Sequence, residues 1–522
     1  MDRIVPGLAG APDEVDVLVI GLGVTGAGVA LDAASRGLRV LAVDAHDLAF
    51  GTSRFSSKLV HGGLRYLANG QVGVAHESAV ERGILMETTA PHLVRPMPSL
   101  IPLSVGVGRA QGLLAGAGLL GGDLLRRSAG TGADTLPRPR RLSAAETRRL
   151  APSLRAAGLR GALLGWDGQL EDDARLVTTI ARTAAQQGAA IHTHARVLEI
   201  DDSGHEVALR DELDGRRTTV RARAVVNAAG VWAGDLTDDV RLRPSRGTHL
   251  VLSPESLPGL RVAVFAPIPG ESNRFVLVLP QPDGQLYVGL TDEPVDGPVP
   301  DVAEPSEVEI GFLLDVVSAS FERPLRRADV VGAFAGLRPL LDNGNGQGGD
   351  GDATADLSRK HAVLTSASGV VTVVGGKLTT YRQMAEDAVD RAVEVAGLRA
   401  GACRATTLPL TGAAPREELA RRIELAGSPG EARLLRRFGA DADLVLTVAR
   451  ETTGLPDADL LAPVADGLPA TLAELVFGVT HEGAADTADL LDRRTRVGLV
   501  AADRERAVPA AERALGYAAV RS

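Results

Sequence analysis

The sequence predicts an α/β fold that is followed by a separate helical region, an α/β + α architecture. Three stretches of the chain support this prediction. Residues 16–44 alternate between strand and helix patterns around a glycine-rich turn, and residues 241–335 contain short apolar strands separated by proline and glycine. After Gly401 the patterns are helical to the end. This succession predicts a parallel sheet with helices, an antiparallel sheet and a helical domain.

The first stretch is a βαβ unit. An apolar run at 17–20 predicts a buried parallel strand, an alanine-rich helix extends to Arg36, and residues 40–43 predict a second strand. Asp44 ends that strand, about twenty residues after the glycine-rich turn, where a carboxylate accepts hydrogen bonds from ribose hydroxyls. Strand, helix, second strand and acid together predict a nucleotide site.

The glycines of this unit have separate predicted roles. Gly21 permits the tight turn, Gly23 lets the backbone approach a pyrophosphate, and Gly26 lets the helix pack on the strand. The start of the helix then presents free N–H groups and the positive end of its dipole to the phosphates. The segment TSRFSSKLVHGGLRYL at 52–67 follows, and its hydroxyls fit a long dinucleotide such as FAD better than NAD.

The next elements are less regular. A helical pattern runs to about residue 90, where prolines end it, and residues 105–128 form an apolar helix with Leu113, Leu120 and Leu124 on one face. Ser143 and Glu146 predict a capping box. A helix ending near residue 188 leads into three strands, the last of which runs into Asn-Ala-Ala-Gly at 227–230.

The second half of the chain continues with the antiparallel strands of 241–335, which we interpret as a substrate-binding cap. A glycine-rich loop at 342–353 follows, and a parallel strand at 370–374 then reaches Gly375, Gly376 and Lys377. The helix after it begins at about Thr379.

Composition excludes several classes of protein. The net charge of −10 argues against a general nucleic-acid or anionic-membrane surface. No apolar run approaches the roughly eighteen residues of a spanning helix, and acidic residues near the N-terminus argue against a secretory signal. Cys403 is the sole cysteine, so no intrachain disulfide is expected and a reducing cytoplasm fits. No metal constellation is present in the sequence.

The basic residues predict an anion site assembled from distant segments. Lysine is scarce (Lys58, Lys360 and Lys377), so each lysine is more significant than a single arginine. Arg65 with Tyr66, Arg338, Arg359, and Lys377 lie in motif-like surroundings, and arginine forks suit a phosphate. For a base of near-neutral pKa, His249 is the candidate, while Lys377 requires a strongly lowered pKa.

These motifs closely resemble FAD-dependent, respiratory glycerol-3-phosphate dehydrogenases. The resemblance runs from Asp16 to about Arg496 and rests on GLGVTGAGVALDAASRG, TSRFSSKLVHGGLRYL, EDDARLV, NAAGVW, RGTHLV, LTDEP, GLRPL, VGGKLTTYR and DRRTR. It implies a Rossmann-like FAD domain of the glutathione-reductase/amino-acid-oxidase type, a sheet-containing cap and a terminal helical domain. Implied boundaries are 14–100, 160–240 and 355–398 for FAD, 101–159 for a helical, possibly membrane-contacting insertion, 241–354 for the cap and 400–522 for the helical domain.

The resemblance also implies the site residues. Catalysis is expected from His249, Arg338 and Lys377, and substrate binding from Arg65, Tyr66, Arg338, Arg359 and Lys377. FAD is expected to contact Gly21, Gly23, Val24, Thr25, Gly26, Asp44, Thr52, Ser53, Ser57, Lys58, His61, Gly62, Gly230, Gly376, Lys377, Leu378 and Thr379.

The implied reaction is oxidation of sn-glycerol 3-phosphate to dihydroxyacetone phosphate, with hydride passing to FAD and electrons passing on to membrane quinone. The expected location is the cytoplasm, on the cytoplasmic face of the membrane, with residues 108–127 as the contact and a homodimer as a further expectation. Apolar insertion is expected to contribute more to attachment than anionic lipid does. The alternatives are an oxidase that uses oxygen, a related hydroxy-acid or amine oxidoreductase, and a non-catalytic FAD-binding scaffold. Burial of the same leucines in the protein core is the alternative to membrane contact.

Overall fold

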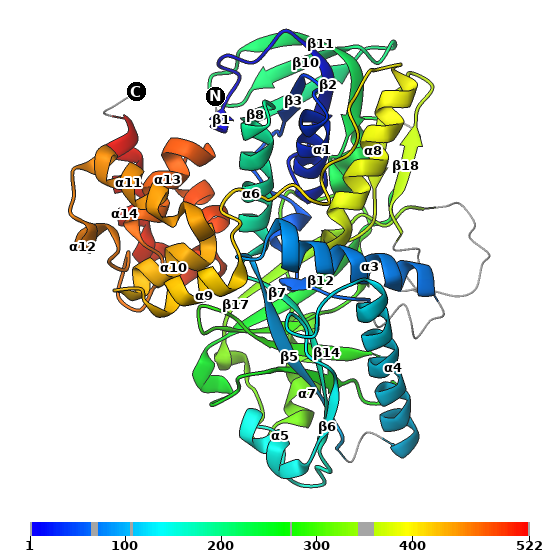
Figure 1. The fold of residues 1–522 in the computed structure, drawn as a ribbon, viewed down its shortest axis with the longest axis vertical. Coiled ribbons are helices and arrows are strands. Elements are labelled where there is room, and N and C mark those ends of the chain that lie inside the picture. Colours follow the sequence, from blue (N-terminus) through cyan, green and yellow to red (C-terminus); the bar gives the residue numbers. More distant parts are fainter. Residues whose placement is uncertain are drawn as a thin grey trace.

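The computed structural model describes residues 3–63, 71–104, 108–237, 239–271, 274–342 and 360–519. Two sheets occupy opposite ends of the long axis, and a group of helices lies beside them (Figure 1). The first sheet is built around the βαβ unit, the second contains the antiparallel strands, and the helices come from the C-terminal part. The α/β + α architecture predicted from the sequence is confirmed.

The first sheet has a parallel centre with antiparallel strands at its margins. Its order is β1-β8-β3-β2-β11-β10-β9, with β19 paired to β11 and β18 paired to β19. β2 pairs in parallel with β3, β11 lies on its other side, also parallel, and Val17 and Val19 are fully buried. The strands are β1 Val5–Pro6, β2 Glu14–Ile20, β3 Val40–Val43, β8 Ala190–Thr193, β9 Ala195–Ile200, β10 Glu206–Asp211, β11 Arg217–Asn227, β18 Ala362–Thr365 and β19 Val371–Val374.

Three helices share a core with this sheet: α1 Val24–Ser35, α6 Asp173–Gln186 and α8 Tyr381–Val395. The contact between α1 and α8 is close, because a Cβ on Gly28 would lie 2.9 Å from the Tyr381 ring. This packing brings the start of α8, far away in sequence, next to the glycine-rich turn.

The second sheet has the order β16-β12-β15-β14-β13-β5-β7-β4, with β17 beside β12 and β6 beside β7. Helix α7 (Glu307–Ser320) packs on it through a separate core. The strands are β4 Leu59–Val60, β5 Val94–Pro102, β6 Arg140–Leu142, β7 Ala162–Leu170, β12 Ser245–Leu252, β13 Ala263–Pro267, β14 Phe275–Pro280, β15 Leu286–Gly289, β16 Glu293–Pro294 and β17 Val330–Arg338.

β5 and β7 correct the expected domain boundaries. The sequence placed most of both strands in the FAD-binding segments, but they pair with each other along nine residues and β5 joins β13 of the second sheet. Segments 94–102 and 162–170 therefore belong structurally with the cap strands. The alternating pattern of a strand does not say which sheet it joins, since that depends on distant partners.

A helical excursion lies beside the second sheet in Figure 1, with α3 at mid-height on the right, α4 at the lower right and α5 at the bottom. It contains α3 (Val72–Ile84, continued as a π turn to Thr89), α4 (Arg109–Ser128) and α5 (Ala144–Leu150). The expected capping box is present, because Ser143 Oγ accepts from the Glu146 amide at 3.2 Å. Among the described residues, no helix has both the length and the apolar character needed to cross a bilayer.

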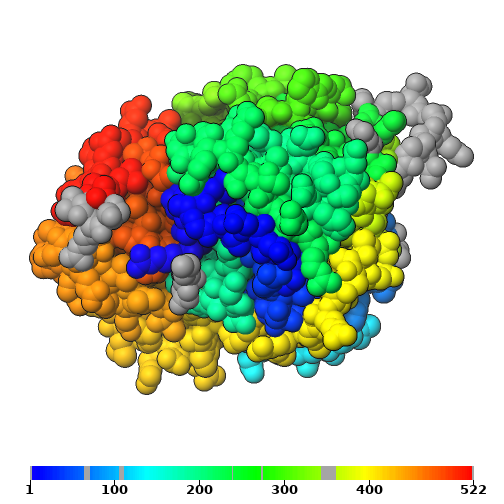
Figure 2. Space-filling model, turned by 90° about the horizontal axis from the view of Figure 1, so that it is seen from above, coloured from blue at the N-terminus to red at the C-terminus, as the bar shows by residue number. Residues whose placement is uncertain are grey.

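The C-terminal helices are α9 Arg416–Glu424, α10 Pro429–Phe438, α11 Ala442–Thr453, α12 Asp457–Leu460, α13 Leu472–Glu482 and α14 Ala501–Ala519. Figure 2 shows them (orange and red) beside the N-terminal segment (blue), and the Ile4 amide donates to the carbonyl of His481 at 3.3 Å. They therefore pack directly against the start of the chain.

Buried ion pairs attach this helical part to the first sheet. Arg494 binds the Asp47 carboxylate with two hydrogen bonds of 2.7 Å, and Arg175 of α6 pairs with Glu482. Burial alone would raise the pKa of Asp47, but the guanidinium groups of Arg494 and Arg493 hold it below its ordinary value. Such pairs specify geometry more than they add stability. Since Asp47 lies three residues after Asp44, the DRRTR segment supports the loop at the nucleotide site.

Candidate functional site

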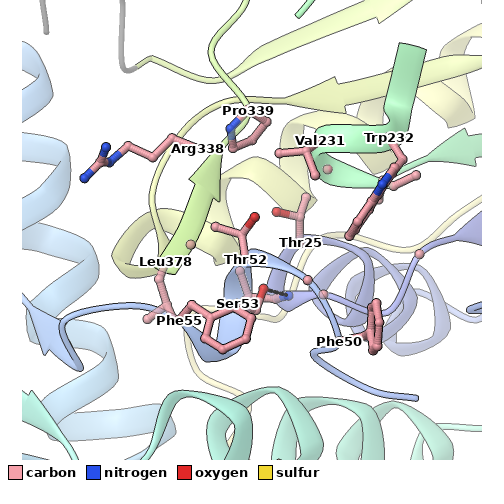
Figure 3. Close-up of a pocket in the computed structure, with 18 of the residues that line it drawn as sticks. Thr25, Phe50, Thr52, Ser53, Phe55, Val231, Trp232, Arg338, Pro339 and Leu378 are labelled. Carbon is pink, nitrogen blue, oxygen red and sulfur yellow. Dashed lines mark hydrogen bonds between the residues drawn. The ribbon is translucent and has the colours of Figure 1, made fainter. Parts of the chain in front are cut away.

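One elongated cavity of about 640 Å³ lies where the first sheet meets β12 and β17 of the second. The carboxyl ends of β2, β11 and β19 reach it, which is where open α/β sheets bind ligands. In Figure 3, Phe50 and Trp232 lie at one side of the cavity, Arg338 at the other, and Thr52 and Ser53 between them. The cavity thus has an aromatic end, a glycine-lined middle and a polar end.

The middle is formed by the turn between β2 and α1. Gly21 has φ +96°, and a Cβ there would lie 2.6 Å from the carbonyl oxygen of Ala228. A Cβ on Gly26 would lie 1.8 Å from the carbonyl oxygen of Gly21, so only glycine lets the helix approach the turn. A Cβ on Gly23 would meet only Ser53 Oγ, at 3.1 Å. Gly23 therefore keeps space clear for a ligand, whereas Gly26 serves the packing of the protein itself.

Asp44 closes this part of the cavity. Its two carboxylate oxygens accept from the amides of Leu22 at 2.6 Å and His46 at 2.9 Å. These bonds fix the carboxylate at the end of β3, where it lines the cavity. Burial nevertheless raises its pKa. The position is that of the ribose-binding acid predicted from the sequence.

The aromatic end involves residues that the sequence patterns did not single out. Phe50 stacks on His46 with ring centroids 3.8 Å apart, and Trp232 lies 6.4 Å from Phe50. Residues 195–198 at the start of β9 also line this cavity. Flat aromatic surfaces of this kind suit a heterocyclic base.

At the polar end, His249 on β12 is almost completely buried and its Nε2 lies 2.8 Å from Ser57 Oγ. Its ring stacks on Phe334 of β17, with centroids 4.9 Å apart. Burial, together with the positive charges of Lys58 and Arg338, lowers the pKa of His249 to about 3. The imidazole is therefore neutral at physiological pH, but a pKa this low makes it a weaker base than the near-neutral group expected from the sequence.

The two other catalytic candidates, Arg338 and Lys377, line the same cavity. Arg338 is oriented by Asp292 at 3.0 Å, by Ser245 Oγ at 3.1 Å and by the carbonyl oxygen of Thr291 at 3.1 Å. Lys377 follows two glycines of positive φ, and its Nζ donates to Ser78 Oγ of α3 at 2.7 Å. Both residues line the cavity with His249, so segments separated by more than a hundred residues meet there.

The structure brings most of the expected site residues to this cavity, and three lie behind its wall. Gly26 and Gly62 serve packing, since a Cβ on Gly62 would lie 2.5 Å from the Arg82 guanidinium. Arg65, Tyr66 and Arg359 lie outside the described residues. Those lining the cavity are Gly21, Gly23, Val24, Thr25, Asp44, Thr52, Ser53, Ser57, His61, Gly230, His249, Arg338, Gly376, Lys377, Leu378 and Thr379.

Lys58 is the third residue behind the wall, and its position corrects the expectation that it contacts the cofactor. Its side chain is fully buried, and Nζ donates to Asp173 Oδ2 at 2.8 Å and to the carbonyl oxygen of Arg54 at 2.6 Å. Asp173 also accepts from Ser56 Oγ at 2.7 Å. Lys58 thus anchors the segment that presents Ser57. The backbone at Lys58 is left-handed, with φ +57°, and this bend turns the Lys58 side chain away from the cavity that Ser57 lines.

The comparisons with known proteins agree with this site. Residues 16–382 match the FAD dependent oxidoreductase family, and residues 403–519 match the C-terminal domain of alpha-glycerophosphate oxidase. Glycerol-3-phosphate dehydrogenase 1 of Mycobacterium tuberculosis is 54% identical over 498 residues, which cover 95% of this chain and 94% of that protein. The chain belongs to the FAD-dependent glycerol-3-phosphate dehydrogenase family.

Two further family members extend the comparison. Glycerol-3-phosphate dehydrogenase 2 of Mycobacterium tuberculosis is 36% identical over 504 residues, and the aligned region covers 93% of this chain and 82% of that protein. The FAD complex of the glycerol-3-phosphate dehydrogenase from Bacillus halodurans superposes with a TM-score of 0.75 at 27% identity, covering 98% of this chain and 92% of that one. The similarity to this structure thus extends over nearly the whole chain, the C-terminal helical part included.

The cavity fits FAD on its own features. The glycine-lined turn leaves room beside the start of α1 for a pyrophosphate, Asp44 is placed for a ribose, and an aromatic end continues from them. Gly376 also lines the cavity, although a Cβ there would lie 2.4 Å from Met384 Sδ, so its lack of a side chain serves the packing of the protein itself. Within the described ranges, His, Cys, Asp and Glu side chains form no group of three that could hold a metal ion.

Sequence reasoning missed the support of the site more than the site itself. Asp173, which holds Ser56 and Lys58, lies in the EDDARLV motif and was marked only by resemblance. Asp292, which orients Arg338, lies in LTDEP in the same way. An acid at the start of a helix is usually interpreted as a helix cap, which is the role of Asp172 here, so the sequence does not indicate that the next residue, Asp173, binds a distant lysine. Asp292 lies between two strands, and its sequence pattern likewise does not indicate its partner Arg338.

Proposed function

We propose that this chain oxidises sn-glycerol 3-phosphate to dihydroxyacetone phosphate and passes the electrons to membrane quinone. The observation that carries the proposal is the polar end of the FAD cavity. Arg338, Lys377 and His249 line it together, although they lie on β17, after β19 and on β12. A site that only held FAD would not need two cations and a neutral imidazole at one end.

The cations account for the phosphate of the substrate. Arg338 presents a planar guanidinium whose N–H groups match phosphate oxygens, and Lys377 adds a second, compact charge to the lining of the cavity. The contacts of Arg338 with Asp292, Ser245 and Thr291 hold it in one orientation before substrate arrives. We infer that this preorganised pair selects the phosphorylated polyol over free glycerol.

His249 is our candidate for the group that takes the hydroxyl proton of C2. FAD, when bound, supplies the acceptor for the hydride that leaves the same carbon. The pKa of His249 is low in part because Arg338 is positively charged, so a phosphate dianion on Arg338 raises it and strengthens the base. Removal of one proton and one hydride converts the secondary alcohol to a ketone, and the electrons balance.

The experiment for this function is anaerobic mixing of the purified holoprotein with glycerol 3-phosphate. We expect loss of the oxidised flavin absorbance and formation of one dihydroxyacetone phosphate per flavin. Glycerol at the same concentration is the control and should leave the flavin oxidised. An unchanged flavin spectrum with glycerol 3-phosphate, or bleaching by an amino or hydroxy acid instead, would reject the proposal.

Quinone as acceptor is supported by the exposure of α4. Leu113, Leu120 and Leu124 of this helix are 77%, 67% and 67% exposed. Three large apolar side chains exposed on one helix indicate an interaction surface. Leu125 instead packs on Val74 and Ala75 of α3, the helix whose Ser78 meets Lys377. A helix of this kind can lie in the membrane interface, where quinone is dissolved.

Replacing Leu113, Leu120 and Leu124 with Gln tests this contact. We expect the variant to stay in solution, to keep its FAD and its turnover with a soluble dye, and to lose most quinone reduction in vesicles, because the exposed leucines contribute little to folding. Flotation with vesicles and a dye-versus-quinone assay provide the measurements. Hydrogen peroxide formed in air at the rate of substrate oxidation would assign the enzyme to the oxidases. Quinone reduction equal to wild type would place the contact elsewhere.

A further inference from the structure

The segment around α4 differs in charge from the rest of the protein. Residues 101–160 contain ten arginines, no lysine and only Asp123, Asp134 and Glu146 as acids, whereas the whole chain carries a net charge of −10. This segment therefore carries a net charge of +7 (ten arginines minus three acids), and the rest of the chain carries −17 (−10 minus 7). The weak response to anionic lipid was expected from the net charge of the whole chain. That net charge does not show the local excess of arginine in residues 101–160.

These arginines border an apolar groove. A groove of about 750 Å³ lies along α4 and is lined by Leu113, Leu120, Arg140, Arg141 and Arg160 among others. The three arginines are exposed. Apolar side chains and guanidinium groups thus face the same space, with leucines on the helix and charges on the segments opposite.

The local acids do not cancel this charge. Asp123 pairs with Arg126 and Arg127, and Glu146 lies 3.4 Å from Arg140 in an exposed pair that contributes little. After these pairs, several arginines of the segment remain in excess. An arginine fork binds the two oxygens of a phosphate, and it is less strongly hydrated than a lysine ammonium, so it suits the headgroup layer of a membrane.

We propose that the α4 groove is a binding surface for anionic phospholipid headgroups, and that this charge sets which face of the enzyme meets the membrane. The inference rests on the proposed membrane contact and adds the chemistry of the lipid to it. Apolar side chains enter the interface while Arg140, Arg141 and Arg160 bind lipid phosphates. The acidic remainder of the molecule is repelled by the same surface, so the protein docks with α4 toward the bilayer. This replaces the expectation that apolar insertion contributes more to attachment than anionic lipid does.

The contribution of these arginines to vesicle binding is large enough to measure. A basic residue near an anionic leaflet strengthens attachment roughly five- to tenfold, and the effect decays within a Debye length. Removing three arginines should therefore weaken binding to anionic vesicles by about a hundredfold. Binding to neutral vesicles, which depends on the leucines, should change little.

The experiment compares the holoenzyme with the variant Arg140→Gln, Arg141→Gln, Arg160→Gln in flotation with phosphatidylcholine vesicles, with and without phosphatidylglycerol. A matched control carries Arg216→Gln, Arg217→Gln and Arg221→Gln. Those exposed arginines lie in or beside β10 and β11, at the opposite end of the long axis in Figure 1. We expect wild type and control to prefer the anionic vesicles, the groove variant to lose that preference, and salt of about 1 M to abolish it.

The outcomes separate this inference from the proposed membrane contact. Equal binding of wild type to neutral and anionic vesicles, or equal losses in the groove and control variants, overturns the lipid assignment but leaves the membrane contact standing. No binding to either vesicle overturns both. A change of oligomeric state in the groove variant, with vesicle binding unchanged, assigns the groove to a second copy of the chain and overturns the lipid assignment. FAD content and dye-linked turnover should equal wild type in both variants.

Discussion

Arg338→Ala is expected to lower kcat/KM for glycerol 3-phosphate roughly 30-fold to several thousandfold while FAD stays bound. Truncating one partner of a charge pair at a desolvated contact costs about 2–5 kcal/mol. For Arg338→Ala we expect this loss in the binding of the substrate phosphate. Asp292, Ser245 and the carbonyl oxygen of Thr291 orient the Arg338 guanidinium at the cavity wall. Steady-state kinetics with glycerol 3-phosphate, and with glycerol as the poor substrate, provide the measurement. The residual rate with glycerol should change little.

The chain offers a matched control on the neighbouring strand. Arg246 of β12 lies opposite Leu337, is about as exposed as Arg338, and pairs with Glu309 at 2.8 Å, but it does not line the cavity. Arg246→Ala therefore removes a comparable buried pair without touching the proposed phosphate site. Equal losses of kcat/KM in the two variants, or equal losses for the two substrates, would mean that Arg338 supports the fold rather than the phosphate.

The second large effect is expected at the glycine-rich turn, where substitution of Gly26 should impair folding and substitution of Gly23 should impair FAD binding. Gly26→Ala places a Cβ 1.8 Å from the carbonyl oxygen of Gly21, about half the separation that non-bonded heavy atoms prefer, so α1 must move away from the turn. We expect little soluble protein and no flavin. In Gly23→Val the new Cβ has only Ser53 Oγ nearby, at 3.1 Å, so the protein itself has room for it. The valine side chain instead occupies the space expected for the pyrophosphate. We expect a folded protein that purifies colourless.

Far-ultraviolet circular dichroism, thermal melting and the flavin absorbance of the purified proteins distinguish these two outcomes. Gly118→Ala is the control, because a Cβ there has no atom within 4 Å, and it should purify yellow with wild-type stability. Full FAD occupancy in Gly23→Val would remove the pyrophosphate from this turn. A normally folded Gly26→Ala protein would show that the helix has room to shift.

The fold was predictable where the physical reason is local. The βαβ unit is encoded within thirty residues, because an apolar strand, glycines without side chains and an alanine-rich helix each act on their neighbours. The capping box at Ser143 and Glu146 is equally local, and the structure contains it. Strands β5 and β7 were assigned to the wrong part of the molecule, since a nine-residue antiparallel pairing depends on which distant strand is free to receive it.

Most residues that the sequence predicted for the site line one cavity, but their arrangement was not predictable. Ser57 and Lys58 are adjacent in a segment expected to contact FAD, yet Ser57 reaches the cavity and Lys58 is buried against Asp173, on the other side of the wall. Only the path of the backbone decides which of the two side chains faces inward. The aromatic end with Phe50 and Trp232 was not predicted at all, because single aromatic residues carry no signal of a shared surface.

By itself, the sequence determined that this protein has a glycine-rich turn between a strand and a helix and belongs among the FAD-dependent glycerol-3-phosphate dehydrogenases, because those features depend on short segments of fixed spacing. Tertiary structure alone decided that His249, Arg338 and Lys377 line one cavity. Their convergence follows from the register of β12 against β17, which sets Ser245 opposite Arg338 and His249 opposite Phe334, and from the return of β19 to the first sheet. Tertiary structure likewise decided that the leucines of α4 face solvent beside arginines, since an amphipathic pattern fits a buried or an exposed face and only the packing of the other elements distinguishes the two.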